Sequence, residues 1–564
     1  MVFTSERKAH IPTQDILSWI FDDVKYDQDK PIYVDTETPS RSISSRQARS
    51  IIRKLAAGFA AAGLQRGDCV CLNSFNDVSL YQAAFVGFPE ALPQVSYSML
   101  FLGIIAAGGI FSGTNPSYTP YELSHHLKVS KSRYVITEAA LLPKVLEATD
   151  KLAIRRENVW IFDVRDITIP PGFKSWTELM NHGEADWQRF DDEKTARETT
   201  AARLFTSGTS GLPKAANLSH YNFVAQHTLV HEIDIKPYES SALLCLPMFH
   251  AACVPVAHTS PLRSGNVAYV MRRFELEPFL SNYQKYKITE MRIVPPIVIA
   301  IIMSPLSQKY SLRSVKIASC GAAPLGKAEQ KKLHNLLAPG ALFTQVWGMT
   351  ETTCIATKFY YPEDDNTGSV GRLLPNIEAK IVDDEGKEVH DYGVRGEMCV
   401  RGPTIVQGYF DNAMANADSF DSDGFFHTGD IVFCDAKTKK WYVVDRKKEL
   451  IKVRGFQVAP PELEAVLLSH SHIVDAAVIG VRHRGEPDLE HPRAYVVKRP
   501  GPKGLGLTPS SVKEFCSGKL AKYKELTGGV VFVDAIPKNA SGKILKRVLR
   551  DQAKIELQQS ASKL

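Results

Sequence analysis

The sequence predicts an α/β protein with a large N-terminal domain, which includes a β-rich subdomain, and a small α+β domain at the C-terminus. Before Gly371, short apolar runs alternate with helix-like stretches, a pattern typical of α/β sheets. After Gly371 the pattern changes to closely spaced strands, and from about Arg446 strands and helices alternate again. We therefore expect one domain over residues 1–445 and a second over residues 446–564.

The predicted elements of the first domain begin with a helix over Gln47–Ala62, where apolar residues recur at helical spacing and Gly63 can cap the end. Short apolar runs then predict strands at Asp68–Asn73, Tyr134–Thr137, Arg203–Thr206, Leu243–Leu246, Val315–Ser319 and Phe343–Val346. Polar or turn-rich segments follow these runs. Because α/β folds bind ligands at the carboxyl ends of their strands, we expect the functional site there.

Beyond Gly371, strands are predicted at Glu378–Val382, Glu397–Val400, Ile431–Phe433 and Trp441–Val444. The C-terminal domain is expected to contain a strand within Ile451–Val458 and strands at Ala476–Val481, Ala494–Val497 and Val530–Val533, with helices at Ser511–Tyr523 and Lys543–Gln552. A further helix should open at Pro460, because proline is well placed in a first helical turn.

Composition excludes several classes of protein. The 564 residues are 44% hydrophobic and 23% charged, which argues against disorder, collagen and coiled coil. A chain of this length can bury a large core without disulfide or metal crosslinks. The nine cysteines are scattered, and only Cys69 and Cys71 lie close together. This distribution argues against a disulfide framework or a zinc ribbon and favours a reducing compartment.

Charge is divided unevenly between the two predicted domains. Residues 446–564 hold 22 Lys and Arg against 12 Asp and Glu, a net charge of +10, whereas the preceding residues hold 46 basic and 50 acidic ones. A basic domain favours a polyanionic partner, either nucleic acid or nucleotide phosphates. We favour nucleotide phosphates over nucleic acid, because this segment has no basic stripe interleaved with aromatics and no zinc-binding spacing.

The C-terminal tripeptide is predicted to be a targeting signal, the alternative being an ordinary solvated tail. The last residues of the chain, Ser562, Lys563 and Leu564, form the tripeptide that a peroxisomal import receptor binds, so we expect a peroxisomal protein with that receptor as a partner. Residues 1–15 contain Glu6, Arg7, Lys8 and Asp15 and no apolar block, so we expect no signal peptide. The most apolar stretches, Met99–Phe111 and Ile293–Met303, are shorter than the ~18 residues of a membrane span. We therefore expect no transmembrane segment.

A glycine-rich loop follows the predicted strand Arg203–Thr206. It consists of Thr206, Ser207, Gly208, Thr209, Ser210 and Gly211, with Lys214 shortly after. Glycines free backbone N–H groups for an anion, hydroxyls add donors, and Lys214 adds positive charge. The spacing differs from a Walker A loop. A phosphate-binding loop and an ordinary surface loop both fit these residues alone.

Six segments in chain order resemble motifs of the adenylate-forming superfamily, which comprises acyl-CoA synthetases, luciferases and peptide-synthetase adenylation domains. They are Thr206–Lys214, Gly321–Leu325, Gln345–Glu351, His427–Asp430, Asp445–Gln457 and Pro537–Lys543. In addition, Gly396–Gly402 is similar to the second signature box of 4-coumarate–CoA ligases. The chain therefore resembles the 4-coumarate–CoA ligase-like peroxisomal acyl- and aryl-CoA ligases.

The resemblance implies a large adenylation domain with a small mobile C-terminal domain, and a reaction in two steps. A small carboxylic acid and ATP form acyl-AMP and pyrophosphate, and CoA then takes the acyl group and releases AMP. ATP, Mg²⁺ and CoA are the implied cofactors and co-substrates. Two alternatives remain: an adenylating enzyme that does not use CoA, as in luciferases, or a non-catalytic nucleotide- or acyl-binding protein.

The resemblance also assigns residues. The nucleotide contacts would be Thr206, Ser207, Gly208, Thr209, Ser210, Gly211 and Lys214 at the phosphates, Gly321, Ala322 and Ala323 along adenine, Trp347 stacked on adenine beside Gly348, Thr350 at the α-phosphate, Asp430 at the ribose, and Arg446 and Lys448 nearby. Glu351 would hold Mg²⁺, which keeps waters and needs few protein ligands. The structural alternatives are a surface acid for Glu351, a turn cap for Asp430 and core packing for Trp347.

The remaining assignments concern the acyl group and CoA. Lys543, expected at the start of a helix, would be the catalytic lysine of the adenylation step. Lys448 would be the hinge about which the small domain turns to exchange Lys543 for Lys452 and Gln457. Arg454 and Gly455 would line the CoA tunnel. His250 would close the acyl pocket, although a lone histidine is equally well explained by a structural role.

Three departures from the family pattern limit the resemblance, the first two of them relative to plant 4-coumarate–CoA ligases. Ala251–Pro255 is small and apolar where those enzymes place a tyrosine, and Trp347 replaces a smaller aromatic, so a hydroxycinnamate is not implied. Val78–Gln94 interrupts the family pattern between strand and helix. Its valine and glutamine codons fit intron borders, so we hypothesise a retained intron or gene-model error. A mature transcript containing these codons would refute this hypothesis, and the segment would then form a surface loop.

Overall fold

The computed structural model describes most of the chain. The described residues are 1–76, 96–163, 168–206, 213–447, 449–453, 456–482, 490–501, 504, 506–520, 522–539 and 542–561. Several predicted positions lie outside them: the interruption Val78–Gln94, the loop residues Ser207–Gly211, Lys448, Arg454, Gly455 and the C-terminal Ser562–Leu564. The side chains of Lys452 and Gln457 are also outside the description.

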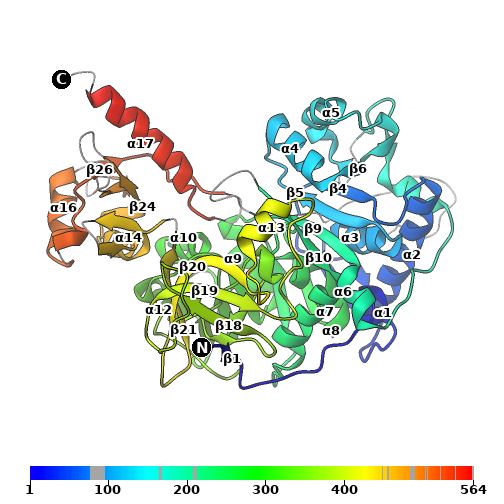
Figure 1. The fold of residues 1–564 in the computed structure, drawn as a ribbon. Helices are drawn as coiled ribbons and strands as arrows, with labels where there is room; N and C mark the ends of the chain where they lie inside the picture. The colour runs from blue at the N-terminus through cyan, green and yellow to red at the C-terminus, as the bar shows by residue number, and fades with distance from the viewer. Residues whose placement is uncertain are drawn as a thin grey trace.

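The first of two seven-stranded sheets has the strand order β10-β9-β5-β4-β6-β7-β8. Its strands are β4 (Cys69–Asn73), β5 (Ile110–Thr114), β6 (Ser132–Thr137), β7 (Val159–Ile161), β8 (Lys174–Ser175), β9 (Thr200–Phe205) and β10 (Ala215–Ser219). The helices α2 (Ser45–Ala61), α3 (Ser96–Ala106), α4 (Pro120–Ser130) and α5 (Leu142–Asp150) pack in pairs beside it (Figure 1). The predicted helix and strands of this region are confirmed, with Gly63 at φ +83° after α2.

The second seven-stranded sheet has the order β15-β14-β13-β11-β12-β2-β3. Its strands are β2 (Pro31–Asp35), β3 (Ser42–Ser44), β11 (Ser241–Leu244), β12 (Val267–Val270), β13 (Glu290–Ile293), β14 (Ile317–Cys320) and β15 (Leu342–Gln345). β13, β14 and β15 are parallel, so their carboxyl ends meet at one edge. The neighbouring helices are α9 (Leu276–Tyr286), α10 (Pro295–Met303) and α12 (Lys327–His334), which share one apolar core with the buried face of the sheet.

The predicted β-rich subdomain is an antiparallel sheet in the order β1-β18-β19-β20-β21. Its strands are β1 (Phe3–Thr4), β18 (Glu378–Val382), β19 (Gly396–Arg401), β20 (Phe426–Cys434) and β21 (Trp441–Arg446). The pairing of β1 with β18 was not predicted, because nothing local in the sequence specifies it. β21 ends one residue beyond the boundary that we placed at residue 445.

The C-terminal domain contains the hairpin β22 (Ile451–Val453) and β23 (Phe456–Val458) and a sheet β24-β25-β26. The other elements are β24 (Ile473–Val481), β25 (His491–Lys498), β26 (Gly529–Phe532), α14 (Pro460–Leu468), α16 (Pro509–Ser517) and α17 (Lys546–Ala561). The prediction of a helix over Ser511–Tyr523 was too long, since α16 ends before Gly518. The helix predicted at Lys543 begins three residues later, so Lys543 lies on the preceding loop.

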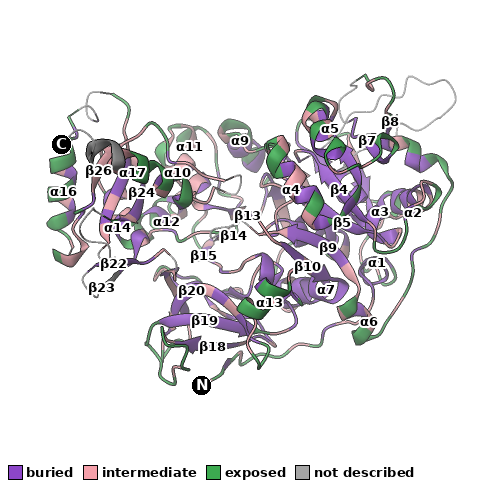
Figure 2. Ribbon diagram, turned by 45° about the horizontal axis from the view of Figure 1, so that its top comes forward, coloured by how far each residue is buried: buried purple, intermediate pink, exposed green. Residues whose placement is uncertain are grey.

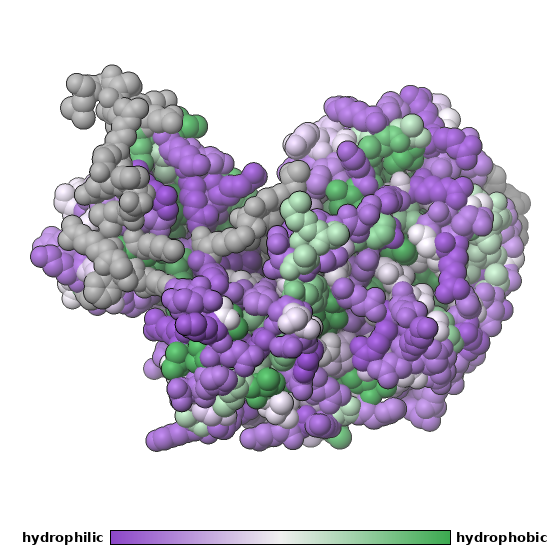
Figure 3. Space-filling model, viewed as in Figure 1, coloured by the Kyte–Doolittle hydropathy of each residue, from purple (hydrophilic) through white to green (hydrophobic). Residues whose placement is uncertain are grey.

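Burial follows this architecture. Figure 2 shows the strands of the large sheets as buried and the exposed residues gathered on outer helices and loops. The face drawn in Figure 3 is mostly hydrophilic, with small scattered apolar areas. Among the described residues, no helix is long and apolar enough to cross a membrane.

Candidate active site

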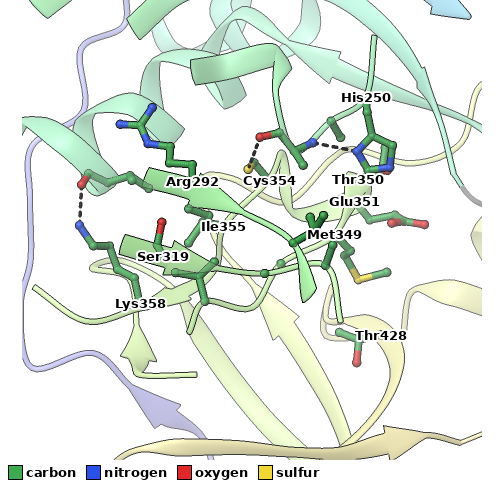
Figure 4. A pocket seen from close by; sticks show the side chains of 18 of the residues that line it. His250, Arg292, Ser319, Met349, Thr350, Glu351, Cys354, Ile355, Lys358 and Thr428 are labelled. Atoms are coloured by element: carbon green, nitrogen blue, oxygen red, sulfur yellow. Dashed lines mark hydrogen bonds between the residues drawn. The ribbon is translucent and has the colours of Figure 1, made fainter. Parts of the chain in front are cut away.

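A cavity of about 750 Å³ lies at the carboxyl ends of β13, β14 and β15, where ligands bind in open α/β sheets. Its lining combines residues of both domains, including Thr350 and Glu351 from the large domain and Lys543 and Arg550 from the small one. The volume falls within the range of ligand pockets. Figure 4 shows part of this lining, with His250, Thr350 and Glu351 on one side and Arg292 and Lys358 on the other.

Backbone geometry shapes the nucleotide side of this cavity. Gly321, Ala322 and Gly348 line it, and Ala322 has the left-handed φ of +70°. A Cβ at Gly348 would lie 1.6 Å from the carbonyl oxygen of Cys354, so only glycine allows this turn. Ala323 is not among the described lining residues.

The two ends of the glycine-rich loop are joined by hydrogen bonds. The backbone N–H of Thr206 donates to the carbonyl of Lys214 at 3.0 Å, and the N–H of Lys214 donates to the Thr206 hydroxyl at 3.3 Å. Both residues line the cavity. The loop between them therefore starts and ends at the predicted nucleotide site.

Glu351 lies at the cavity with 5% of its surface exposed. Tyr409 donates its hydroxyl hydrogen to Glu351 Oε1 at 2.7 Å, and Lys214 Nζ lies 4.6 Å from the centre of the Tyr409 ring. Burial raises the pKa of Glu351, while Tyr409, Arg446 and Lys214 oppose that rise. Tyr409 thus links the predicted metal ligand to the phosphate loop, a role that no sequence motif indicated.

The environment of Glu351 fits Mg²⁺. One carboxylate oxygen accepts from Tyr409, and Glu351 lines the cavity together with the cations Lys214, Arg446 and Lys543. Within the described ranges no group of three or more His, Cys, Asp and Glu side chains forms a metal cluster. A single carboxylate is compatible with Mg²⁺, because this ion retains waters and takes other oxygens from substrate phosphates.

Asp430 lies directly beside the cavity. It follows the lining residues Thr428 and Gly429 on β20, and its partner on β21, Arg446, also lines the cavity. Arg446 Nε lies 3.0 Å from Asp430 Oδ1, and the Trp347 indole N–H donates to Asp430 Oδ2 at 2.8 Å. Trp347 is 7% exposed, belongs to the main core and is not among the described lining residues. In this structure Trp347 positions Asp430, and its stacking on adenine stays a prediction.

We expect Trp347→Phe to raise the KM for ATP about three- to tenfold, with a smaller change in kcat. The substitution removes one of the two side-chain donors to Asp430. A hydrogen bond to a charged group is worth ~1.5–3 kcal/mol, and the remaining contact with Arg446 should limit the loss. Steady-state kinetics at varied ATP would measure this. The matched control is Trp441→Phe, in a buried tryptophan that packs on Phe3. An equal effect of both variants would contradict the assignment.

Lys543 reaches the same region from the small domain. It lines the cavity, and its charge interacts with those of Arg446, Asp430 and Glu351. Burial, followed by the positive charge of Arg446, lowers the pKa of Lys543 to about 8. The loop is held by a hydrogen bond from the N–H of Lys543 to Asn539 Oδ1 at 2.8 Å, and Gly542 packs against Pro296. The structure therefore brings Lys543, Asp430 and Glu351 together.

His250 also lines the cavity. Its Nδ1 accepts a hydrogen bond from the Ala252 N–H at 3.2 Å, and burial, followed by the positive charge of Lys543, lowers the pKa of His250 to about 4. The imidazole is therefore neutral at physiological pH. It can close the acyl pocket without placing a second positive charge beside Lys543.

Lys452 and Gln457 are backbone partners in the hairpin β22–β23. This register places the two residues opposite each other on the paired strands. Their roles in the second step stay predictions.

Other lining residues were not identified from the sequence. Among them are Tyr409, Arg550, His231 and Arg292. Arg550 lies on α17, seven residues after Lys543. Arg292 alternates with apolar residues on β13, a pattern that suggests a solvent-facing side chain.

Comparison with known proteins gives consistent results. The family model "AMP-binding enzyme" matches residues 93–410, and "AMP-binding enzyme C-terminal domain" matches residues 462–543. Two relatives from Aspergillus niger are 52% identical to this chain: a phenylacetyl-CoA ligase, epaB, with 98% of this chain and 99% of the relative covered, and an acyl-CoA ligase, azaF, with 97% and 100% covered.

Among solved structures, ATP-bound MatB from Rhodopseudomonas palustris has a TM-score of 0.82 at 25% identity, covering 96% of this chain and 99% of that one. The predicted arrangement of a large N-terminal and a small C-terminal domain of mixed α/β sheets is thereby confirmed. The chain belongs to the AMP-binding enzyme family of the adenylate-forming superfamily.

Proposed function

We propose that the protein is an ATP-dependent acyl- or aryl-CoA ligase that converts a carboxylic acid to its acyl-AMP and transfers the acyl group to CoA. The observation that carries the proposal is the convergence of Lys543, Asp430 and Glu351, from two domains, at one cavity that Thr206 and Lys214 also line. The names of the 52% identical relatives, both CoA ligases, support the same reaction class.

In the first step the protein must hold a carboxylate against the α-phosphate of ATP. Lys214 would neutralise the outer phosphates and Asp430 would accept the ribose hydroxyls. Lys543, which is partly buried at the cavity, would bridge the attacking carboxylate and the α-phosphate. A preorganised charge in such a setting acts strongly on the transition state. Mg²⁺ held by Glu351 would neutralise developing phosphate charge.

In the second step the thiol of CoA must reach the carbonyl carbon of the acyl-AMP. In this structure Lys543 lines the cavity where that carbonyl would lie. We propose that the small domain turns about Lys448, withdraws Lys543 and presents Lys452 and Gln457 to the acyl-AMP. Arg454 and Gly455 would then line the CoA path. The net charge of +10 on residues 446–564 suits a domain that meets polyphosphates in both steps.

The first test is a panel of carboxylic acids assayed for pyrophosphate release with and without CoA. We expect release that depends on the acid, and acyl-CoA formation when CoA is present. Medium-chain fatty acids, aryl acids such as phenylacetate and precursors of specialised metabolites belong in the panel. Steady AMP release without CoA would instead favour an adenylating enzyme that does not use CoA, and nucleotide binding without turnover would favour a non-catalytic protein.

The pH dependence of adenylation supplies a second prediction. Because the pKa of Lys543 in the free protein is lowered to about 8, its charge is present below that pH and is lost as the pH rises through it. We expect kcat/KM, which reports the free enzyme, to fall above about pH 8. A profile that stays flat to about pH 10, the range of an ordinary lysine, would contradict the role of Lys543.

We also propose a peroxisomal location, on the evidence of Ser562–Leu564 at the C-terminus. The chain with a fluorescent protein fused to its N-terminus, which leaves the C-terminal tripeptide free, should accumulate in peroxisomes. Removal of the three residues should leave it in the cytosol. The same distribution for both forms would contradict the proposal.

A further inference from the structure

A second group of charged side chains lies in the cavity, away from the predicted nucleotide contacts. Arg292, Lys358, Lys236, Glu290 and Asp234 all line it. Figure 4 shows Arg292 and Lys358 on the side opposite Thr350 and Glu351, with Cys354 and Ile355 between the two sides. This distal end is the part of the cavity that the adenylation chemistry does not use.

Strand register explains how the distal end is built. On β13, β14 and β15, Arg292, Ser319 and Thr344 are paired in one row, and Glu290, Ile317 and Leu342 in the row before it. All six line the cavity, whereas the alternate residues face the opposite, buried side of the sheet. The cavity therefore runs along one face of this sheet, from the carboxyl ends of its strands toward Glu290.

The charges at this end do not cancel. Lys358 Nζ pairs with Asp234 Oδ2 at 2.6 Å, and both side chains are at most 10% exposed. Glu290 is bound by two cations, Lys236 and Arg292, the latter through Nη2 at 2.9 Å. Three cations thus face two anions, which leaves one positive charge in surplus. Glu363 also lines the cavity, but it is paired with Arg372 and Lys440 outside this group.

The surplus charge belongs to Arg292. Lys236 and the Ser240 hydroxyl both reach Glu290 Oε1, so Glu290 keeps partners without the arginine. Arg292 is bound through Nη2 alone among the described contacts, and its side chain is 29% exposed although the strand is interior. Arg292 and its pairing partner on the neighbouring strand, Ser319, both line the cavity, so the remaining N–H groups of Arg292 are available to a ligand there.

A second polar group faces the same region. His231 lines the cavity, and burial, followed by the charge of Arg292, holds its pKa well below the usual value. The imidazole is therefore neutral. A neutral imidazole can donate one hydrogen bond without adding charge.

We propose that the substrate acid carries an oxygen acceptor at the end opposite its reacting carboxylate, and that Arg292 binds this distal oxygen. The inference rests on the proposed ligase function and adds a substrate class to it. An arginine presents several donors in a fixed geometry and binds anionic or carbonyl oxygen strongly. A wholly apolar tail would leave the guanidinium desolvated and partly unpaired, which is unfavourable.

The test compares linear acids of graded length, each offered as the plain acid, the ω-hydroxy acid and the α,ω-diacid, by kcat/KM for acyl-CoA formation. At the best length we expect an oxygenated acid to exceed the plain acid by roughly 10- to 100-fold, as a charge-assisted hydrogen bond permits. A larger gain for the diacid would identify charge pairing as the source, and a larger gain for the hydroxy acid would identify hydrogen bonding.

The matched variants are Arg292→Met, Arg292→Lys and, as a control, Arg313→Met at an exposed position. Arg292→Met should remove most of the preference, because Lys236 still pairs with Glu290 and the surplus charge is gone. Arg292→Lys should retain part of it, and Arg313→Met should retain all of it. Thermal unfolding of each variant would show that the fold is preserved.

The outcomes separate the inference from the proposed function. Plain acids that are used as well as oxygenated acids at every length would overturn the inference and leave the ligase function standing. An unchanged preference in a folded Arg292→Met variant would also overturn it. Failure to activate any acid would overturn the proposed function and, with it, the substrate class.

Discussion

Lys543→Ala is expected to lower the rate of adenylation by a factor of about 100 to 1000, while ATP still binds. The ammonium lies where charge develops between carboxylate and α-phosphate, and loss of one preorganised electrostatic group typically costs a factor of this size. ATP binding should persist, because Lys214, Asp430 and Arg446 remain in place. ATP–pyrophosphate exchange measures the rate of adenylation, and equilibrium binding measures the affinity for ATP.

The same variant tests the two-step proposal. If the small domain withdraws Lys543 before CoA arrives, Lys543→Ala should convert preformed acyl-AMP and CoA to acyl-CoA at nearly the parental rate. The control is Lys554→Ala, a lysine on α17 whose side chain is 75% exposed, and both steps should be unaffected by it. Parental pyrophosphate exchange in Lys543→Ala would show that its assignment is wrong.

Local patterns predicted β14 and β15, two of the three strands at the cavity edge, because short apolar runs and the turns after them are encoded within a few residues. No strand was predicted at β13. The pairing of Phe3 with Ala379 could not be predicted, since it depends on tertiary packing across most of the chain. The helix after Lys543 began later than expected, because Asn539 organises a loop through Lys543 before α17 starts.

The candidate site likewise contains residues that sequence motifs identify and residues that only the three-dimensional structure reveals. Motif resemblance identified Glu351, Asp430 and Lys543, which the fold brings to one place. Tyr409 lies outside any element and belongs to no motif that we recognised, so its bond to Glu351 becomes visible only in three dimensions. Arg292 was overlooked because its strand, β13, was not predicted. An alternating polar residue on a strand also usually faces solvent, whereas here that face of the sheet lines a cavity.

Glu351→Gln is expected to reduce kcat for adenylation by roughly 100-fold or more and to raise the Mg²⁺ concentration needed for half-maximal rate. The amide can still accept from the Tyr409 hydroxyl, so the local structure should persist. The lost negative charge is the one that would hold the metal beside the phosphates. Magnesium titrations of ATP–pyrophosphate exchange would measure both effects, with Glu329→Gln, a glutamate on α12 that is absent from the cavity lining, as the control.

The pH dependence of the magnesium requirement makes this assignment sharper. Burial raises the pKa of Glu351, so protons compete with the metal for the carboxylate. In the parent protein the Mg²⁺ requirement should therefore fall as the pH rises through that raised pKa and then level off. Glu351→Gln has no proton to lose, and its requirement should stay high and nearly independent of pH over the same interval. Parallel profiles for the two proteins would mean that the metal is held elsewhere and that Glu351 has a structural role with Tyr409.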